Sequence, residues 1–113
     1  MAYNLERTEQ IRELLLYEAD VAERKMFGSI GFIVNGKICI GVGDHDDHQM
    51  MVRVDPEEYD KILLKVGAAP AIIRGRERKG YVFLSEKAII TDKQLAYWVR
   101  LALDYNKKLR PKG

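Results

Sequence analysis

The residues best suited to ligand chemistry stand together in one short polar stretch. The string Asp44-His45-Asp46-Asp47-His48 offers two imidazoles and three carboxylates. Nitrogen and oxygen donors of these kinds bind divalent transition metals, so His45, Asp47 and His48 are the candidate ligands. The spacing is not specific in a loop, however, and a polar hairpin tip explains the same residues. We therefore expect no metal and no other cofactor.

A second group of candidate residues is basic. It consists of Arg53, Arg74, Arg76, Arg78 and Lys79. Alternation along predicted strands would place Arg53 and Arg74 on one uncovered sheet face. Such a group can attract phosphate, a carboxylate or an acidic protein surface. The alternative interpretation is a solvated, charged hairpin, in which Glu77 offsets part of the charge and the arginines discourage pairing between sheet edges.

The sequence contains no arrangement that indicates catalysis or nucleotide binding. Its glycines do not form a phosphate-binding string, and no glycine-rich turn leads from a strand into a helix. Cys39 stands in an apolar run, a poor setting for a reactive thiolate. The Glu57-Glu58 pair is explained by helix capping. We expect that the protein is not an enzyme.

The elements that would position these residues follow from apolar spacing and turn residues. Helical spacing covers residues 4–22. Two extended runs, 29–34 and 37–42, flank Asn35-Gly36, which predicts a type I′ hairpin. In that hairpin Phe32 would face Cys39, and Ile33 would face Ile38. Residues 50–54 form a third strand.

Capping residues mark two further helices. Asp55 is a predicted N-cap followed by Pro56, and Gly67 stands where a left-handed C-cap would end the helix. Its predicted apolar stripe is Tyr59, Ile62, Leu63 and Val66. Thr91 and Gln94 form a capping box at the start of the last helix. That helix would bury Leu95, Trp98, Val99, Ala102, Tyr105 and Leu109 and expose Tyr97.

Between these helices, residues 71–74 and 81–84 are extended and flank a charged loop, 75–80, as in a second hairpin. The expected order is α-β-β-β-α-β-β-α. This order favours an α+β fold, a two-layer sandwich with a mainly antiparallel sheet. We expect one domain over residues 1–113, with 106–113 as a basic tail.

Composition narrows the class of protein. The 19 basic and 17 acidic side chains leave a net charge of +2, so strong nonspecific binding to nucleic acid is not expected. One cysteine cannot form an internal disulfide, which favours a reducing, cytoplasmic compartment. No signal peptide or membrane-spanning apolar run is present in the sequence. We therefore expect no membrane partner.

Several short motifs carry a family resemblance. They are Met26-Phe27-Gly28, Asn35-Gly36-Lys37, Met51-Val52-Arg53-Val54, Lys79-Gly80-Tyr81 and the stretch 95–102 around Trp98. With the element order, they make the chain resemble the N-terminal domain of TfoX/Sxy proteins over nearly its whole length. The resemblance implies a fold like that of secretion chaperones and an association with regulators of natural competence genes. It brings no catalytic residues, and we expect a stand-alone domain without the second domain of longer members. The 44–48 stretch departs from the family by being longer and richer in histidine.

Two hypotheses for function follow. The first is a regulatory protein-interaction module that presents its sheet face or its basic hairpin to a partner protein. The second is direct binding of nucleic acid through the basic group and the tail, which predicts affinity that falls steeply with salt. A homodimer through a sheet edge or face is compatible with the first hypothesis.

Overall fold

The computed structural model describes residues 5–18, 20–26, 29–45 and 48–109. In chain order the elements are α1 (Leu5–Leu14), β1 (Val21–Met26), β2 (Ser29–Val34), β3 (Lys37–His45), β4 (His48–Arg53), α2 (Tyr59–Ile62), β5 (Ala68–Ile73), β6 (Arg76–Ser85) and α3 (Asp92–Lys108). Short 3-10 helices, Pro56–Glu58 and Glu86–Ala88, precede α2 and follow β6.

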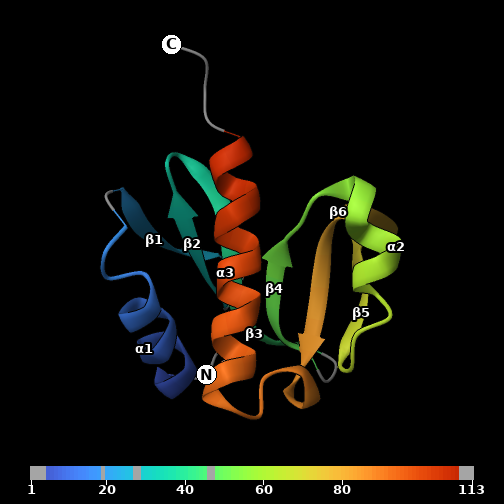
Figure 1. The fold of residues 1–113 in the computed structure, drawn as a ribbon, viewed down its shortest axis with the longest axis horizontal. Coiled ribbons are helices and arrows are strands. Elements are labelled where there is room, and N and C mark those ends of the chain that lie inside the picture. Colours follow the sequence, from blue (N-terminus) through green and yellow to red (C-terminus); the bar gives the residue numbers. More distant parts are fainter. Residues whose placement is uncertain (1–4, 19, 27–28, 46–47, 110–113) are drawn as a thin grey trace.

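Within these described ranges the strands form one antiparallel sheet in the order β1-β2-β3-β4-β6-β5. The helices lie on one side of it (Figure 1). Helix α3 packs across β3 and β4, α2 packs against β6, and α1 lies beside α3. The predicted α+β class and two-layer architecture are confirmed, with one strand more than the sequence predicted.

The hydrophobic core fills the space between the sheet and the helices. Large buried side chains alternate along β2, β3, β4 and β6 and point toward the helices, as the pleat requires. They include Ile30, Phe32, Val34, Ile40, Val42, Met50, Val52, Val82 and Leu84. Ile11 and Leu15 from the α1 region, Ile62 from α2, and Leu95, Trp98, Val99 and Ala102 from α3 complete it. The opposite face of the sheet carries no helix of the described chain.

The first helix is shorter than predicted, because residues 21–26 form a strand. Residues 4–22 had been expected as one helix on the spacing of apolar residues. Strand β1 lies at the sheet edge, where exposed Glu23, Arg24 and Lys25 suit a protected edge strand. The Arg12 guanidinium donates to both carboxylate oxygens of Glu23 at 2.6 and 2.7 Å and holds α1 against β1.

The first hairpin is confirmed, with a correction to its register. Asn35 and Gly36 have φ angles of 53° and 79°, as a type I′ turn requires. Ile33 pairs with Ile38 as expected, but Phe32 pairs with Ile40. The register shifts there because Cys39 occupies a β-bulge, which puts two residues of β3 opposite one of β2.

The predicted second helix is present but irregular. The Asp55 carboxylate caps it by accepting from the Glu57 amide at 2.9 Å, and Tyr59 and Ile62 are buried. Val66 was predicted to be part of the buried stripe and is exposed. Gly67 has the predicted left-handed conformation, with φ 81°. The correction at Val66 follows from the helix ending at Ile62, which leaves later residues off its buried face.

The second hairpin is tighter than predicted. The turn is Arg74-Gly75, with φ angles of 54° and 75°, so Arg74 lies in the turn and not on a strand. Residues 76–80, expected as a charged loop, form the first half of β6. The glycine in second position supplies the positive φ that lets the chain reverse in two residues.

Helix α3 begins as predicted. The Gln94 amide donates to Thr91 Oγ1 at 3.1 Å, and the Thr91 amide donates to Gln94 Oε1 at 3.0 Å, which completes the capping box. Toward its end, Tyr105 and Leu109 are only half-buried, and Asn106 takes the buried position. Asn106 Nδ2 donates to the Val34 carbonyl at 2.9 Å and thereby ties the helix to the first hairpin.

Some predictions fall on residues outside the described ranges. Phe27, Gly28, Asp46, Asp47 and the last tail residues, 110–113, are among them. None of the helices in the described part of the chain combines the length and apolar character needed to cross a membrane.

Candidate functional site: the open sheet face

The side of the sheet opposite the helices carries apolar side chains where water would normally favour polar ones. We call this surface the open sheet face and define it by Ile33, Ile38, Gly41, Met51, Arg53, Tyr81 and Phe83. These residues alternate with the core residues of their strands and pair across them: Ile33 with Ile38, Gly41 with Met51, Met51 with Phe83, and Arg53 with Tyr81. An antiparallel sheet with one wet face usually alternates apolar and polar residues. Here both faces are apolar.

A shallow hollow lies near the centre of this face. Its volume is about 260 Å³, and its lining includes Gly41, Gly43, Met51, Ile73 and Phe83. Gly41 has no side chain to fill the space, and a Cβ added there would lie at an ordinary 3.5 Å from Met51 Cε. Small-molecule sites usually enclose roughly 300–1,000 Å³. The hollow is therefore better suited to one inserted side chain than to a cofactor.

His48 stands at the rim of the hollow. Its ring lies 4.8 Å from that of Phe83, tilted by 43°, so the imidazole packs on an aromatic neighbour. Across the described residues there is no group of three or more His, Cys, Asp or Glu side chains that could hold a metal ion. The candidate ligand Asp47 lies outside those residues, and the side chain of His45 is not described either. The expectation that no metal binds here therefore stays a prediction.

Arg53 lies on the open sheet face as predicted. Its guanidinium carbon lies 5.7 Å from the centroid of the Tyr81 ring, a distance typical of a cation–π contact. Arg74 does not share this face, because it occupies the β5–β6 turn. Arg53 therefore contributes to an apolar and aromatic surface, whereas the other predicted cations belong to the hairpin.

The remaining predicted cations cluster on the β5–β6 hairpin. Arg74, Arg76, Arg78 and Lys79 are all exposed. Glu77 stands among them and accepts a hydrogen bond from the Tyr59 hydroxyl at 2.7 Å. Burial, and then this contact, raise the pKa of Tyr59 to about 12. We call residues 74–79 the basic hairpin, since it carries four cations and one carboxylate.

Cys39 is buried as predicted. Burial raises the pKa of its thiol to about 12, far from the range of reactive cysteines. Its side chain contributes to the core cluster next to Ile40. Within the described structure, Cys39 is a packing residue of the core.

Sequence reasoning missed Gly41, Met51 and Phe83 as site residues. The pattern that identifies them was present, because Ile33, Met51 and Phe83 put apolar side chains at the strand positions opposite the core. Alternation alone predicts strands and does not show which face of a sheet is covered. The side on which the helices pack, which decides the exposed face, required the structure.

The fold and this surface together describe a two-layer α+β domain with one apolar sheet face uncovered. The chain belongs to the TfoX N-terminal domain family, whose model matches residues 13–105. The match includes every residue that defines the open sheet face and the whole basic hairpin. No curated protein matches the chain.

Proposed function

We propose that this protein is a regulatory protein-interaction module and not an enzyme, and that a partner protein covers its open sheet face. The proposal adopts for this chain the role in competence regulation that the TfoX/Sxy resemblance implies. One observation carries it: apolar residues occupy the outward positions of the central strands. These side chains are half-buried within the domain, and neighbouring apolar side chains that stay accessible to water mark interaction sites in water-soluble domains.

The composition of the face supports a protein partner. Met51, Phe83 and Tyr81 are of the residue types enriched at the centres of protein interfaces. Arg53, stacked on Tyr81, adds a planar cation of the kind found at interaction hot spots. The hollow above Gly41 would receive one apolar side chain of the partner.

The test compares capture of partners from extracts of the native host by wild type and two variants. Met51→Asp places a charge beside the hollow, and we expect it to abolish capture of a stoichiometric protein. Leu16→Asp, at a residue that is 69% exposed in the turn after α1 and is not part of the open sheet face, is the matched control and should leave capture intact. Equal capture by wild type and both variants would refute the proposal for this face.

The basic hairpin supports a second candidate function, direct binding of nucleic acid. Four exposed cations within residues 74–79 provide a local phosphate-attracting surface on a chain of small net charge. If it binds nucleic acid, titration with labelled DNA or RNA will show affinity that falls steeply with salt and is lost in Arg76→Glu/Arg78→Glu. Salt-independent binding, or binding retained by that variant, would exclude the hairpin as the site.

A further inference from the structure

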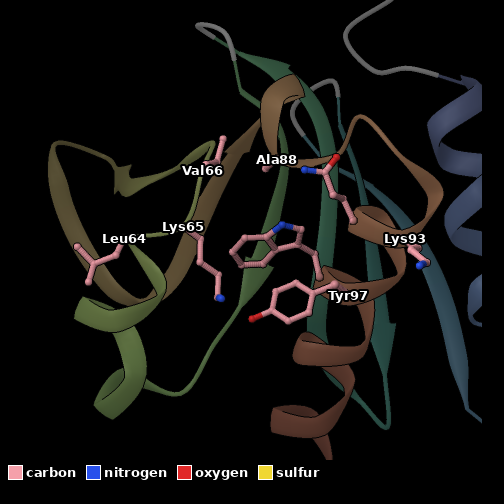
Figure 2. A pocket seen from close by; sticks show the side chains of 8 residues that line it. Leu64, Lys65, Val66, Ala88, Lys93 and Tyr97 are labelled. Atoms are coloured by element: carbon pink, nitrogen blue, oxygen red, sulfur yellow. The ribbon is translucent and has the colours of Figure 1, made fainter.

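A groove on the helical layer is separate from the open sheet face. It runs between the segment that follows α2 and the first turns of α3, with a volume of about 470 Å³ (Figure 2). Its lining residues are Leu64, Lys65, Val66, Ala88, Lys93, Gln94, Tyr97 and Trp98. Two walls distant in sequence therefore face each other across it.

The floor and margins of the groove are apolar. Trp98, only 3% exposed, forms the floor, and Tyr97 stands edge-on to it with ring centroids 5.3 Å apart. On the other wall Leu64 and Val66 are 85% and 71% exposed. Large aliphatic side chains this exposed beside an aromatic floor offer contact area that the domain itself does not use.

The groove walls are fixed by backbone contacts. Gly67, next to Val66, approaches Ala88 so closely that an added Cβ would lie 2.4 Å from the Ala88 nitrogen. The Ser85 amide also donates to the Gly67 carbonyl at 2.9 Å. With the capping box at Thr91 holding the start of α3, the groove is a preformed feature, which lowers the entropy lost on binding.

Both charged side chains that line the groove are lysines, one from each wall. Lys65 Nζ lies 5.0 Å from the centroid of the Tyr97 ring, reaching across from the α2 side in Figure 2. Lys93 lies one helical turn before Tyr97 on α3. Asp92, the acidic residue of that turn, lines a different hollow with Gln10 of α1. In Figure 2 Lys65 stands on the α2 side of Tyr97 and Lys93 at the opposite margin, so the positive charge lies on the two margins of an apolar centre.

We propose that this groove binds a short acidic segment of a partner protein, in which a bulky apolar side chain is flanked by Asp or Glu. The apolar side chain lies on Trp98 between Val66 and Tyr97. The flanking carboxylates approach Lys65 and Lys93, which complement them in charge. This inference goes beyond the function proposed for the open sheet face, because it concerns other residues on the opposite layer and a partner of stated chemistry.

Trp98 makes the proposal directly measurable, since it is the single tryptophan of the sequence. The probe is a synthetic peptide with Asp and Glu on either side of a central Leu-Phe pair. Its counterparts carry Lys in place of each acidic residue, or Ser in place of the apolar pair. We expect saturable change of Trp98 emission with the acidic peptide, weakened by added salt, and none with the two counterparts.

Variants assign the binding to the groove. Lys65→Glu/Lys93→Glu should weaken binding of the acidic peptide by about tenfold or more, because attraction becomes repulsion. Arg24→Glu/Lys25→Glu, at two exposed positions on β1 at the far edge of the sheet, is the charge-matched control and should bind as wild type does. Leu64→Ser/Val66→Ser removes apolar contacts from exposed positions, so the fold is retained while binding is lost. Circular dichroism and the unfolding midpoint check that each variant is folded.

Three results would overturn the proposal. They are absence of saturable binding of the acidic peptide to wild type, equal affinity for the lysine counterpart, and undiminished affinity in the Leu64→Ser/Val66→Ser variant. The backbone amide shifts of Leu64, Val66 and Tyr97 give a second readout that does not depend on fluorescence. None of these results bears on Met51→Asp, so failure here is distinguishable from failure of the function proposed for the open sheet face.

Discussion

Replacing Gly67 by alanine tests how the α2–β5 connection is joined to the segment before α3. Gly67 has φ 81°, and an added Cβ would lie 2.4 Å from the nitrogen and 2.6 Å from the Cβ of Ala88. The glycine cannot easily move away, since its carbonyl accepts from the Ser85 amide. Gly67→Ala should therefore be destabilising for two separate reasons, conformation and overlap.

The magnitude follows from those two reasons. An L-residue in the left-handed region costs about 1–2 kcal/mol, and forced overlap in a packed region costs about 1–3 kcal/mol. The loss of freedom in the unfolded alanine chain offsets about 0.4–1 kcal/mol. We expect a net destabilisation of about 1–4.5 kcal/mol. A domain of this kind has a free energy of unfolding of about 5–15 kcal/mol, so the variant remains folded without denaturant.

Gly75→Ala is the matched control. Gly75 has φ 75°, but nothing lies within 4 Å of an added Cβ, so only the conformational cost applies. Urea unfolding followed by circular dichroism gives both free energies, and Gly67→Ala should be the more destabilising by about 1–3 kcal/mol. Equal effects of the two substitutions would refute the reasoning that close approach to Ala88 fixes this connection.

Three further predictions concern single contacts. Asn106→Ala should lower the free energy of unfolding by about 1–3 kcal/mol in urea titrations, because the buried carbonyl of Val34 loses its hydrogen-bond donor. An unchanged midpoint of urea unfolding would contradict this prediction. Burial raises the pKa of the Cys39 thiol to about 12. Cys39 should therefore react with a thiol reagent at pH 8 at least about a hundredfold more slowly in the native protein than in denaturant. Equal reaction rates in the two states would show that the thiol is accessible. The hydrogen bonds from Arg12 lower the pKa of Glu23, so Glu23 contributes stability above its ordinary pKa that is lost as pH falls through the lowered value. Glu23→Gln should therefore be less stable than wild type at neutral pH and equally stable in strong acid. A difference in the free energy of unfolding that stays the same at every pH would contradict this linkage.

Local patterns in the sequence were sufficient to predict the structure where one contact between sequence neighbours decides it. Asn35-Gly36 adopts the two positive φ angles of its turn, and the Thr91–Gln94 capping box starts α3 where expected. Both arise from neighbours in sequence, which is why they could be predicted. The buried positions of Trp98 and Val99 also follow from spacing along one helix.

Features that depend on distant residues were not predictable in the same way. The first helix had been expected to end at residue 22, and no strand had been expected before residue 29. Residues 21–26 instead pair with β2 and place Glu23 against Arg12. The bulge at Cys39 changes the register of Phe32 without any turn residue to mark it. Arg74 was expected on a strand because its neighbours are apolar. A turn of two residues shifts it to the tip of the hairpin.

The two candidate surfaces also depend on residues that are distant in sequence, so they could not be predicted from local patterns. Outward apolar residues such as Ile33 and Met51 can be found by alternation, but whether helices cover them depends on how α1, α2 and α3 pack. The groove above Trp98 requires two segments that are about thirty residues apart in sequence. Its one local indication is the stretch 62–66, which holds more apolar residues than one helical face can bury.

Site-specific photo-crosslinking in cells of the native host tests the central claim most directly. A photoreactive residue is placed at Met51, within the open sheet face, and in a separate variant at exposed Leu16. We expect a discrete protein adduct from position 51 and none from position 16. An adduct of twice the chain mass would identify the partner as a second copy. Absence of any adduct at position 51, or the same adducts from both positions, would contradict the claim that a partner covers this face.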